Sequence, residues 1–320
     1  MRELKPFERY LIHEFVDDWR DGYLTRREMI KRVLYITGGV ATTATVLTQL
    51  GVTPMTRAAL AQETVSTPSA EPMSPLSVAA DDSRVLGEDI TFPAGDGTDV
   101  LAYQARPNPD SGTPMATVLP PLVLICHENR GLTEHIRDVA RRYAVEGYVA
   151  CAVDLLSRNG GFDAIADPAE IPGLLSGTDA QVFVDDFKSA LAYYQEQPFV
   201  DVSRPAMTGF CFGGGITWLA TTQMPELKAA APYYGPPPPL DQVPNITAAV
   251  LGVYSDDPED FANEGREELE AALTDAGVTF EFIVYPDTQH AFHNDTGQRY
   301  NQEQALQARE DTLAWFRQYV

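Results

Sequence analysis

Residues 209–213 have the types and the spacing of a nucleophile turn. They read Gly209-Phe210-Cys211-Phe212-Gly213, which is Gly-x-nucleophile-x-Gly with Cys where Ser is commoner. A short apolar stretch, residues 205–209, precedes the turn, and residues typical of a helix start follow it. Glycines allow so sharp a turn, and the start of the helix favours a thiolate. Cys211 is therefore the predicted nucleophile, and an inert buried Cys in a Gly-rich turn is the alternative.

A nucleophile of this kind needs a base, and the base needs an orienting acid. In hydrolases with this turn the chain order is nucleophile, acid, histidine. His290 is the predicted base, with His293 in reserve. Asp257, which precedes Pro258, is the predicted acid, and the adjacent Asp256 stays an alternative.

The elements that must position these residues are predicted from hydrophobic periodicity and turn residues. Buried strands alternate with amphipathic helices after an initial hairpin, which predicts an α/β fold with a mostly parallel sheet of about eight strands and helices on both faces. The expected strands are 89–93, 100–105, 118–126, 148–153, 205–209, 228–234, 248–254 and 278–285, and the expected helices are 131–146, 179–197, one after Cys211, 263–276 and 298–319.

Sites in such sheets lie at the carboxyl ends of the strands. Polar residues follow several predicted strands at that edge. Glu128 and Asn129 follow one strand, residues 154–158 follow the next, and Cys211 follows the strand before the turn. These positions are expected to surround one site.

The first 61 residues have the pattern of an export signal. Arg26-Arg27 precede an uncharged stretch, 33–52, and a small-x-small site, Ala59-Leu60-Ala61. This pattern predicts a twin-arginine-type leader and a periplasmic, envelope or extracellular location. Retention of the leader as a membrane anchor is the alternative. Residues 62–82 are rich in Pro, Ser and Ala and are predicted to be a disordered linker, so the folded domain is expected at 83–320.

Composition excludes several classes of partner. The net charge is −23, which makes nucleic acid an unsuitable partner. Three cysteines do not make a disulfide framework, and a bridge between Cys126 and Cys151 is the one alternative to free thiols. No spacing resembles a metal or cofactor site, so we expect no cofactor and no metal. The only predicted contact with a membrane is through an uncleaved leader.

Several segments together resemble the dienelactone hydrolase family, a branch of the α/β-hydrolases with a Cys nucleophile. The resemblance covers about residues 82–320 and is carried by segments 209–214, 233–235, 251–254 and 290–292, with two more at 126–131 and 153–158. It implies a carboxylic-ester or lactone hydrolase, for which carboxymethylenebutenolidase is the narrower reading. It also implies a thioester acyl-enzyme, a small-molecule ester or lactone substrate and, most often, a monomer.

The resemblance also assigns further site residues. Glu128 maps to an accessory glutamate that accepts the thiol proton, and Arg158 maps to an arginine that binds a substrate carboxylate. The backbone N–H groups of Phe212 and Asn129 are the implied oxyanion hole. Asn294 stands where the family has a second arginine, and Arg299 is the candidate substitute.

Two other functions remain open from the sequence. A Cys-dependent amidase or deglycase-like enzyme also pairs a glutamate with its Cys, and activity on amides but not esters would identify it. A non-catalytic envelope protein could keep the fold as a binding module. Iodoacetamide distinguishes that case, because an activated Cys211 reacts at mildly acidic pH and an inert one does not.

Overall fold

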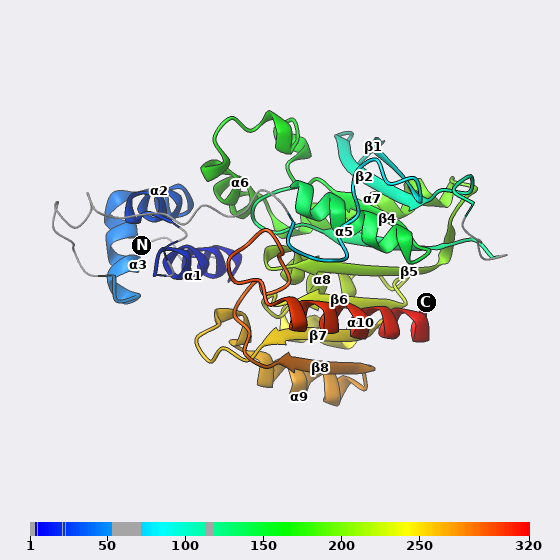
Figure 1. Cartoon of the computed structure of the whole chain (residues 1–320). Helices are drawn as coiled ribbons and strands as arrows, with labels where there is room; N and C mark the ends of the chain where they lie inside the picture. Colours follow the sequence, from blue (N-terminus) through cyan, green and yellow to red (C-terminus); the bar gives the residue numbers. More distant parts are fainter. Residues whose placement is uncertain (1–3, 5, 21, 23, 53–71, 113–117) are drawn as a thin grey trace.

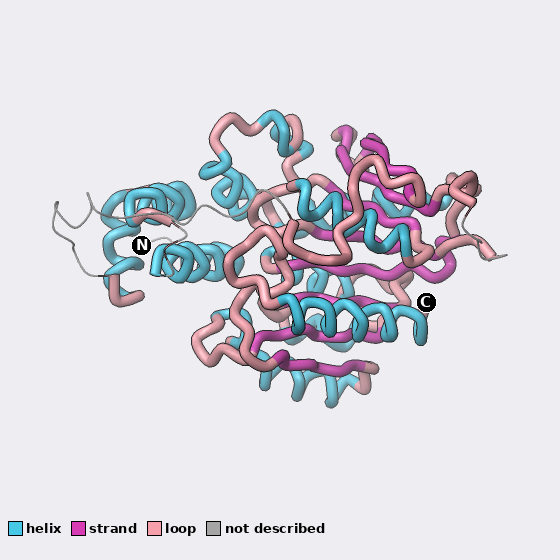
Figure 2. The backbone as a smooth tube through the Cα atoms, in the orientation of Figure 1, coloured by secondary structure: helices cyan, strands magenta, loops and turns pink. Residues whose placement is uncertain are grey.

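The computed structural model describes residues 4, 6–20, 22, 24–52, 72–112 and 118–320. One eight-stranded sheet crosses the molecule, and helices lie on both of its faces (Figures 1 and 2). The strand order is β1-β2-β4-β3-β5-β6-β7-β8, antiparallel at the β1–β2 and β2–β4 pairs and parallel at the others. The predicted fold class is confirmed. The strands are β1 Val85–Pro93, β2 Asp99–Pro107, β3 Pro121–Cys126, β4 Val149–Val153, β5 Asp201–Phe210, β6 Ala229–Tyr233, β7 Ala249–Ser255 and β8 Phe280–Tyr285.

The helices that follow the strands cover the sheet in two layers. Helices α5 and α10 lie on one face and α7 and α8 on the other (Figure 1). The central strands β3, β4, β6 and β7 are buried almost throughout, as their continuous apolar runs predict for strands covered on both sides. The helices of this domain are α5 Glu134–Val145, α6 Ile171–Gly177, α7 Ala180–Gln195, α8 Phe212–Thr221, α9 Arg266–Ala276 and α10 Gln302–Tyr319.

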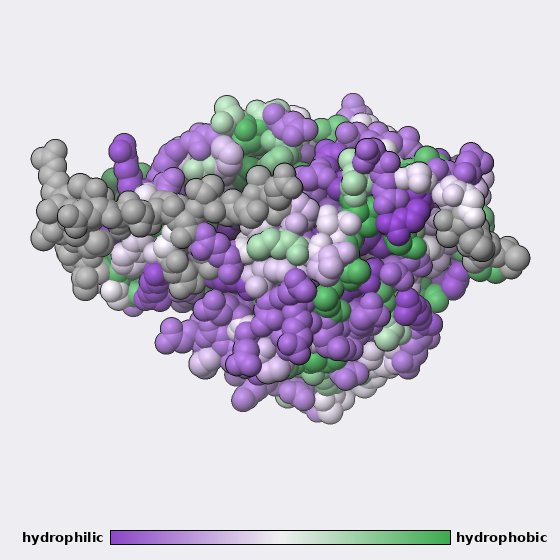
Figure 3. Space-filling view, viewed as in Figure 1, coloured by the Kyte–Doolittle hydropathy of each residue, from purple (hydrophilic) through white to green (hydrophobic). Residues whose placement is uncertain are grey.

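Most predicted elements are present, with shifted ends. The helix expected at 131–146 begins at Glu134, where Thr133 precedes it, and the closing helix begins at Gln302, where the side chain of Asn301 caps it. Helix α6, Ile171–Gly177, was not expected, because seven residues are too few to show helical periodicity. The outer surface seen in Figure 3 is mostly hydrophilic, in keeping with the high net charge.

The segment expected to be a leader forms three helices: α1 Pro6–Arg20, α2 Arg26–Thr37 and α3 Val40–Gln49. Helices α1 and α2 contact α6 of the domain, and α3 packs on α2. Thr25 and Glu28 form a capping box that starts α2 at the paired arginines, and Gly38 ends it in a left-handed conformation. The uncharged stretch 33–52 is thus divided between two short helices. No described helix has the length and apolarity to cross a membrane. The expected cleavage site at 59–61 lies outside the described residues.

The predicted disordered linker needs one correction. Residues 62–71 lie outside the described part, but residues 72–82 are bound to the domain. The backbone N–H of Ser74 donates to Asp295 over 3.1 Å, and that of Val78 donates to Asp138 over 2.7 Å. The small and polar residues of this segment predicted disorder, but its backbone N–H groups donate to buried carboxylates.

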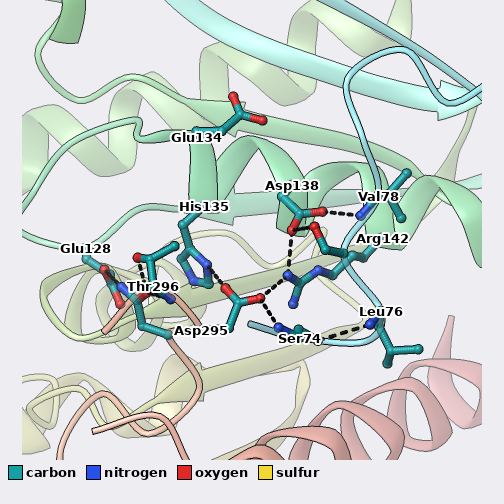
Figure 4. Close-up of polar contacts among 12 residues, drawn as sticks. Ser74, Leu76, Val78, Glu128, Glu134, His135, Asp138, Arg142, Asp295 and Thr296 are labelled. Carbon is teal, nitrogen blue, oxygen red and sulfur yellow. Dashed lines mark hydrogen bonds and ion pairs between the residues drawn. The ribbon is translucent and has the colours of Figure 1, made fainter. Parts of the chain in front are cut away.

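Those carboxylates belong to a buried charged network between α5 and the loop after β8 (Figure 4). Asp295 accepts from His135 over 2.7 Å and from Arg142 over 2.5 Å, and Arg142 also donates to Asp138 over 2.5 Å. Burial alone would raise the pKa of Asp295, but its bonds to His135 and Arg142 outweigh burial and lower it. The network therefore joins residues 72–78, which we call the strap, and the loop after β8 to the same helix, α5.

Replacing Asp295 by Asn should lower the free energy of unfolding by about 3 kcal/mol at pH 7, because it breaks a buried, hydrogen-bonded ion pair. A carboxyl with a lowered pKa stabilises the fold fully above its unfolded pKa of about 4 and loses that contribution as the pH falls. The difference between Asp295→Asn and the wild type should therefore shrink below about pH 4. Urea unfolding at pH 7 and pH 3 measures it. The control Asp275→Asn, on the exposed side of α9, should change stability by less than about 0.5 kcal/mol.

Candidate active site

Cys211 lies on a sharp turn between β5 and α8. It has φ 56°, a left-handed conformation rare for a residue with a side chain, and its N–H donates to the carbonyl of Tyr233 over 3.1 Å. A Cβ on Gly213 would lie 2.4 Å from the carbonyl oxygen of Cys126, so only glycine permits this approach of α8 to β3. The predicted strand, turn and helix are present, and they place Cys211 at the carboxyl edge of the sheet.

His290 lies beside a carboxylate, and that carboxylate belongs to Asp260. His290 Nδ1 is 3.1 Å from Asp260 Oδ1, and Asp260 also accepts from the Ser255 hydroxyl over 2.5 Å and from the Ala262 N–H over 2.9 Å. Burial lowers the pKa of His290, but the charges of Asp260 and Glu14 outweigh burial and raise it. Asp260 thus fixes the ring so that Nε2 points away from it.

The expectation for the acid is corrected by this geometry. Asp257 accepts from the backbone N–H of Glu259 over 2.9 Å, and Asp256 accepts from the N–H groups of Asp287 and Thr288. Both carboxylates bind nearby backbone N–H groups, and neither has a hydrogen bond to His290. The loop after β7 turns back through a 3₁₀ helix, Phe261–Asn263, and this turn brings Asp260 inward.

The thiol of Cys211 contacts a carboxylate from the leader. Cys211 Sγ is 3.2 Å from Glu14 Oε2 on α1, and both residues are almost fully buried. Burial raises the pKa of the Cys211 thiol, and the charges of Glu14 and Glu128 raise it further. Burial also raises the pKa of Glu14, to about 7. In this arrangement Cys211 holds its proton.

Glu128 lies near the thiol, as the family resemblance implies, but it is not the carboxylate bonded to it. Its Oε2 accepts from the Asn294 amide over 2.7 Å, and its buried Oε1 has no hydrogen-bond partner among the described residues. Asn129 is buried next to Glu128, and Phe212 is the first residue of α8. Glu128, Asn129 and Cys211 line one small pocket of about 30 Å³, so these residues are brought together as predicted.

The predicted substrate arginine is not in this pocket. Arg158 pairs with Asp186 over 2.6 Å and with Asp96 over 2.9 Å, in a half-exposed ion pair on the other side of the loop after β4. Asp96 belongs to the hairpin and Asp186 to α7. The sequence pattern could not predict that these two elements lie next to Arg158. The arginines that line the pocket are Arg130 and Arg299, and Arg299 lies 3.2 Å from Asp18 of α1.

The other histidines and cysteines that the sequence singled out are packed in the interior of the domain. His293 stacks on the ring of Phe210, and burial lowers its pKa well below the usual value. His127 accepts from the Leu155 N–H over 3.1 Å. Cys126 and Cys151 are buried free thiols. His290 is therefore the histidine at the thiol, as expected.

Three residues at the site were missed from the sequence: Asp260, Glu14 and Tyr10. Four acidic residues share the loop 256–260, and their order gives no way to choose between them. Glu14 and Tyr10 belong to a segment that was treated as a leader. The amphipathic spacing of buried Leu11, Phe15 and Val16 was the available sign that α1 packs on something.

Glu14, Cys211 and His290 also offer one ligand atom each within 4.8 Å of one another. Carboxylate, thiolate and imidazole are zinc ligands. In this structure Cys211 Sγ is hydrogen-bonded to Glu14 Oε2, and the Nε2 of His290 is 3.2 Å from the Tyr10 hydroxyl. The prediction of no metal stays a prediction.

Comparisons with known proteins agree on one family. Residues 111–320 match the protein family described as Dienelactone hydrolase family. Proteins named "Putative carboxymethylenebutenolidase" from Salmonella typhi and Escherichia coli are each 36% identical, covering 79% and 82% of this chain and 94% and 97% of their own. The crystal structure of the Klebsiella pneumoniae "Putative Dienelactone Hydrolase" aligns with a TM-score of 0.66 and 32% identity, over 73% of this chain and 99% of that one.

Replacing Asp260 by Asn should lower the pKa of His290, because it removes the charge that most raises it. Asp257→Asn, three residues earlier in the same loop and bonded to the Glu259 N–H, is the matched control and should leave the pKa of His290 unchanged. Proton and nitrogen NMR of the His290 ring across a pH titration measures both variants. Equal shifts in the two variants would contradict the assignment of Asp260.

Proposed function

Because the chain belongs to the dienelactone hydrolase family and is a hydrolase of ester or lactone bonds, we propose that Cys211 is its nucleophile, His290 its base and Asp260 the acid that orients the base. The observation that carries the proposal is the 3.1 Å contact of Asp260 with His290 Nδ1, which directs Nε2 toward the side where Cys211 lies. Asp260 takes the role that the sequence suggested for Asp257.

The proposed reaction has two steps through a thioester. His290 Nε2 takes the Cys211 proton, and Sγ attacks the carbonyl carbon of the ester or lactone. The C–O bond to the leaving alcohol breaks, and the imidazolium returns the proton to that oxygen. His290 then deprotonates a water molecule, which attacks the thioester and releases the acid. The proton returns to sulfur, so the enzyme is restored.

The oxyanion formed in each step needs donors. The N–H of Phe212, at the start of α8, and the N–H of Asn129 are the proposed pair, as the resemblance implied. One such donor contributes about 3–4 kcal/mol of transition-state stabilisation. The Cys211 turn supports this role, because the residue after the nucleophile begins a helix and points its N–H toward the site.

Glu128 is the proposed accessory acceptor of the thiol proton when Glu14 is not present. Its support is the unpartnered Oε1, buried in the same pocket as Cys211. A buried carboxylate oxygen without a donor is costly, and a thiol or substrate hydroxyl would satisfy it.

The substrate class is proposed from the cations of the pocket. Arg130 and Arg299 line it, and in this structure Arg299 pairs with Asp18 of α1. A carboxylate on the substrate would find the same partner there. An ester or lactone that carries a carboxylate therefore fits better than a neutral one, and Arg158 has no part in its binding.

The location is proposed as exported, from the paired arginines at the start of α2 and the small-residue site at 59–61. An exported hydrolase would act on esters or lactones from the surroundings of the cell. Its substrate then need not come from a cytoplasmic breakdown pathway.

Cys211→Ala should lower kcat/KM for short p-nitrophenyl esters by about a thousandfold or more, since removal of a triad member has effects of that size. The assay uses the chain without residues 1–61, which keeps all eight strands. His290→Ala should lower kcat/KM by a similar factor, because the same base takes the thiol proton and later activates the water. Turnover that survives Cys211→Ala, or activity on amides alone, would overturn this mechanism.

Arg299→Ala should raise KM for an ester that carries a carboxylate and leave KM for its neutral analogue unchanged, because only the charged substrate loses a partner. The expected change in KM is about tenfold, the effect of one charge-assisted hydrogen bond. Arg158→Ala is the matched control and should change neither value. A rise in KM for both substrates would mean that Arg299 shapes the pocket without binding a carboxylate.

A further inference from the structure

Helix α1 contributes a partner to each of the two reacting groups of the site. Cys211 Sγ is 3.2 Å from Glu14 Oε2, and the Tyr10 hydroxyl is 3.2 Å from His290 Nε2. Tyr10 and Glu14 are one helical turn apart, so a single face of α1 meets both groups. Cys211 is 1% exposed and His290 5% exposed, so a substrate cannot reach either while α1 is in place.

The protonation states favoured by these contacts oppose catalysis. Tyr10 donates its one hydroxyl hydrogen to the carbonyl of Tyr234 over 3.0 Å, so its oxygen accepts from a protonated Nε2 of His290. A protonated histidine cannot take the proton of Cys211. Glu14 accepts from the thiol and holds the proton on sulfur, whereas the thiolate is the nucleophile.

Helix α1 also packs against the domain through contacts other than these two hydrogen bonds. Asp18, one turn after Glu14, lies 3.2 Å from Arg299, and both side chains are more than nine-tenths buried. The Tyr10 ring packs edge-on against Phe261, next to Asp260, with centroids 4.6 Å apart. The helix thus brings two carboxylates to a pocket whose cations are Arg130 and Arg299.

The position of α1 in the sequence indicates what this contact does. The helix comes before the paired arginines and before the expected cleavage site at 59–61, while every residue of the proposed triad comes after it. Figure 1 shows α1 at one end of the domain, among the loops that surround the site, with α2 and α3 outside it. Cleavage of the leader would break the covalent connection of α1 to the domain.

We propose that α1 is an intramolecular inhibitor that occupies the substrate site through Glu14, Asp18 and Tyr10, and that the loss of the leader activates the hydrolase. The inference rests on the proposed function of Cys211 and His290. Before cleavage the chain is a closed precursor. After cleavage the same pocket, with its two arginines, is open to a substrate.

The first test uses the full chain with Glu14→Arg, which puts a positive charge against Arg130 and Arg299 and changes nothing in the domain. Ester hydrolysis and alkylation of Cys211 by iodoacetamide are measured, both with EDTA present to exclude metal inhibition. If α1 is docked in about 90% or more of the molecules, both rates should rise at least about tenfold. The control Arg20→Gln removes a charge at the exposed end of α1, where Arg20 bonds to Asp17 and to the Leu50 carbonyl, and should leave both rates unchanged.

A second test separates release of α1 from loss of folding. A site-specific protease sequence is inserted after Ala61 in the full chain, and activity is followed as the protease cuts. Hydrolysis should rise with cleavage and fall again on addition of a synthetic peptide of residues 6–20. The same peptide with Glu14→Ala and Tyr10→Phe should inhibit at least about tenfold more weakly, since each change removes a hydrogen bond to the site.

The outcomes distinguish the inhibitor from the proposed function. Equal hydrolysis and equal alkylation in the intact chain, the cleaved chain and Glu14→Arg would overturn inhibition by α1. An absence of ester hydrolysis in every form would overturn the proposed function. In that case the alkylation rates still show whether α1 shields Cys211.

Discussion

The close approach of helix α8 to the sheet at Cys211 is the constraint on which the site depends. It is possible because Gly213 lies against the backbone of β3, where a side chain would overlap the carbonyl of Cys126. The approach forces Cys211 into a left-handed conformation and leaves its side chain at the edge of the sheet, with the start of α8 beneath it. The surrounding strands, buried on both faces, hold that strained turn in place.

The parallel arrangement then decides which other groups can meet Cys211. Strands β3, β5 and β7 all end at this edge, so Glu128, Cys211 and Asp260 converge although they come from segments that are far apart in the sequence. The loop after β8 completes the site with His290. The family match and the shared fold of the Klebsiella structure agree with this construction from strand ends.

The sequence predicted the regular parts of this construction well, because long apolar runs and helical spacing report burial directly. It predicted Cys211, Glu128 and Asn129 at one edge, since each closely follows a strand, and it placed His290 there after a short loop. It expected Asp257 beside the histidine, where Asp260 lies, because Asp256, Asp257 and Asp260 share one loop and only the turn at Phe261 decides which carboxylate faces inward. It misplaced Arg158, since ion pairs to Asp96 and Asp186 depend on distant elements that no local pattern describes.

The contacts of the leader were beyond sequence reasoning for another reason. A targeting segment is normally set aside before the fold is considered, and its composition agreed with that treatment. Only the structure shows that Glu14 lies against the thiol, although the two residues are 197 positions apart.

The strap of residues 72–78 also limits how far the chain can be shortened from its amino end. It begins some ten residues after the small-residue site and binds Asp295, five positions beyond His290, through the backbone N–H of Ser74. The strap therefore fastens the loop that carries the histidine to the domain. A chain shortened past Ser74 would lose this bond to the loop, whereas Ser77 and Val78 would still hold Asp138 of α5.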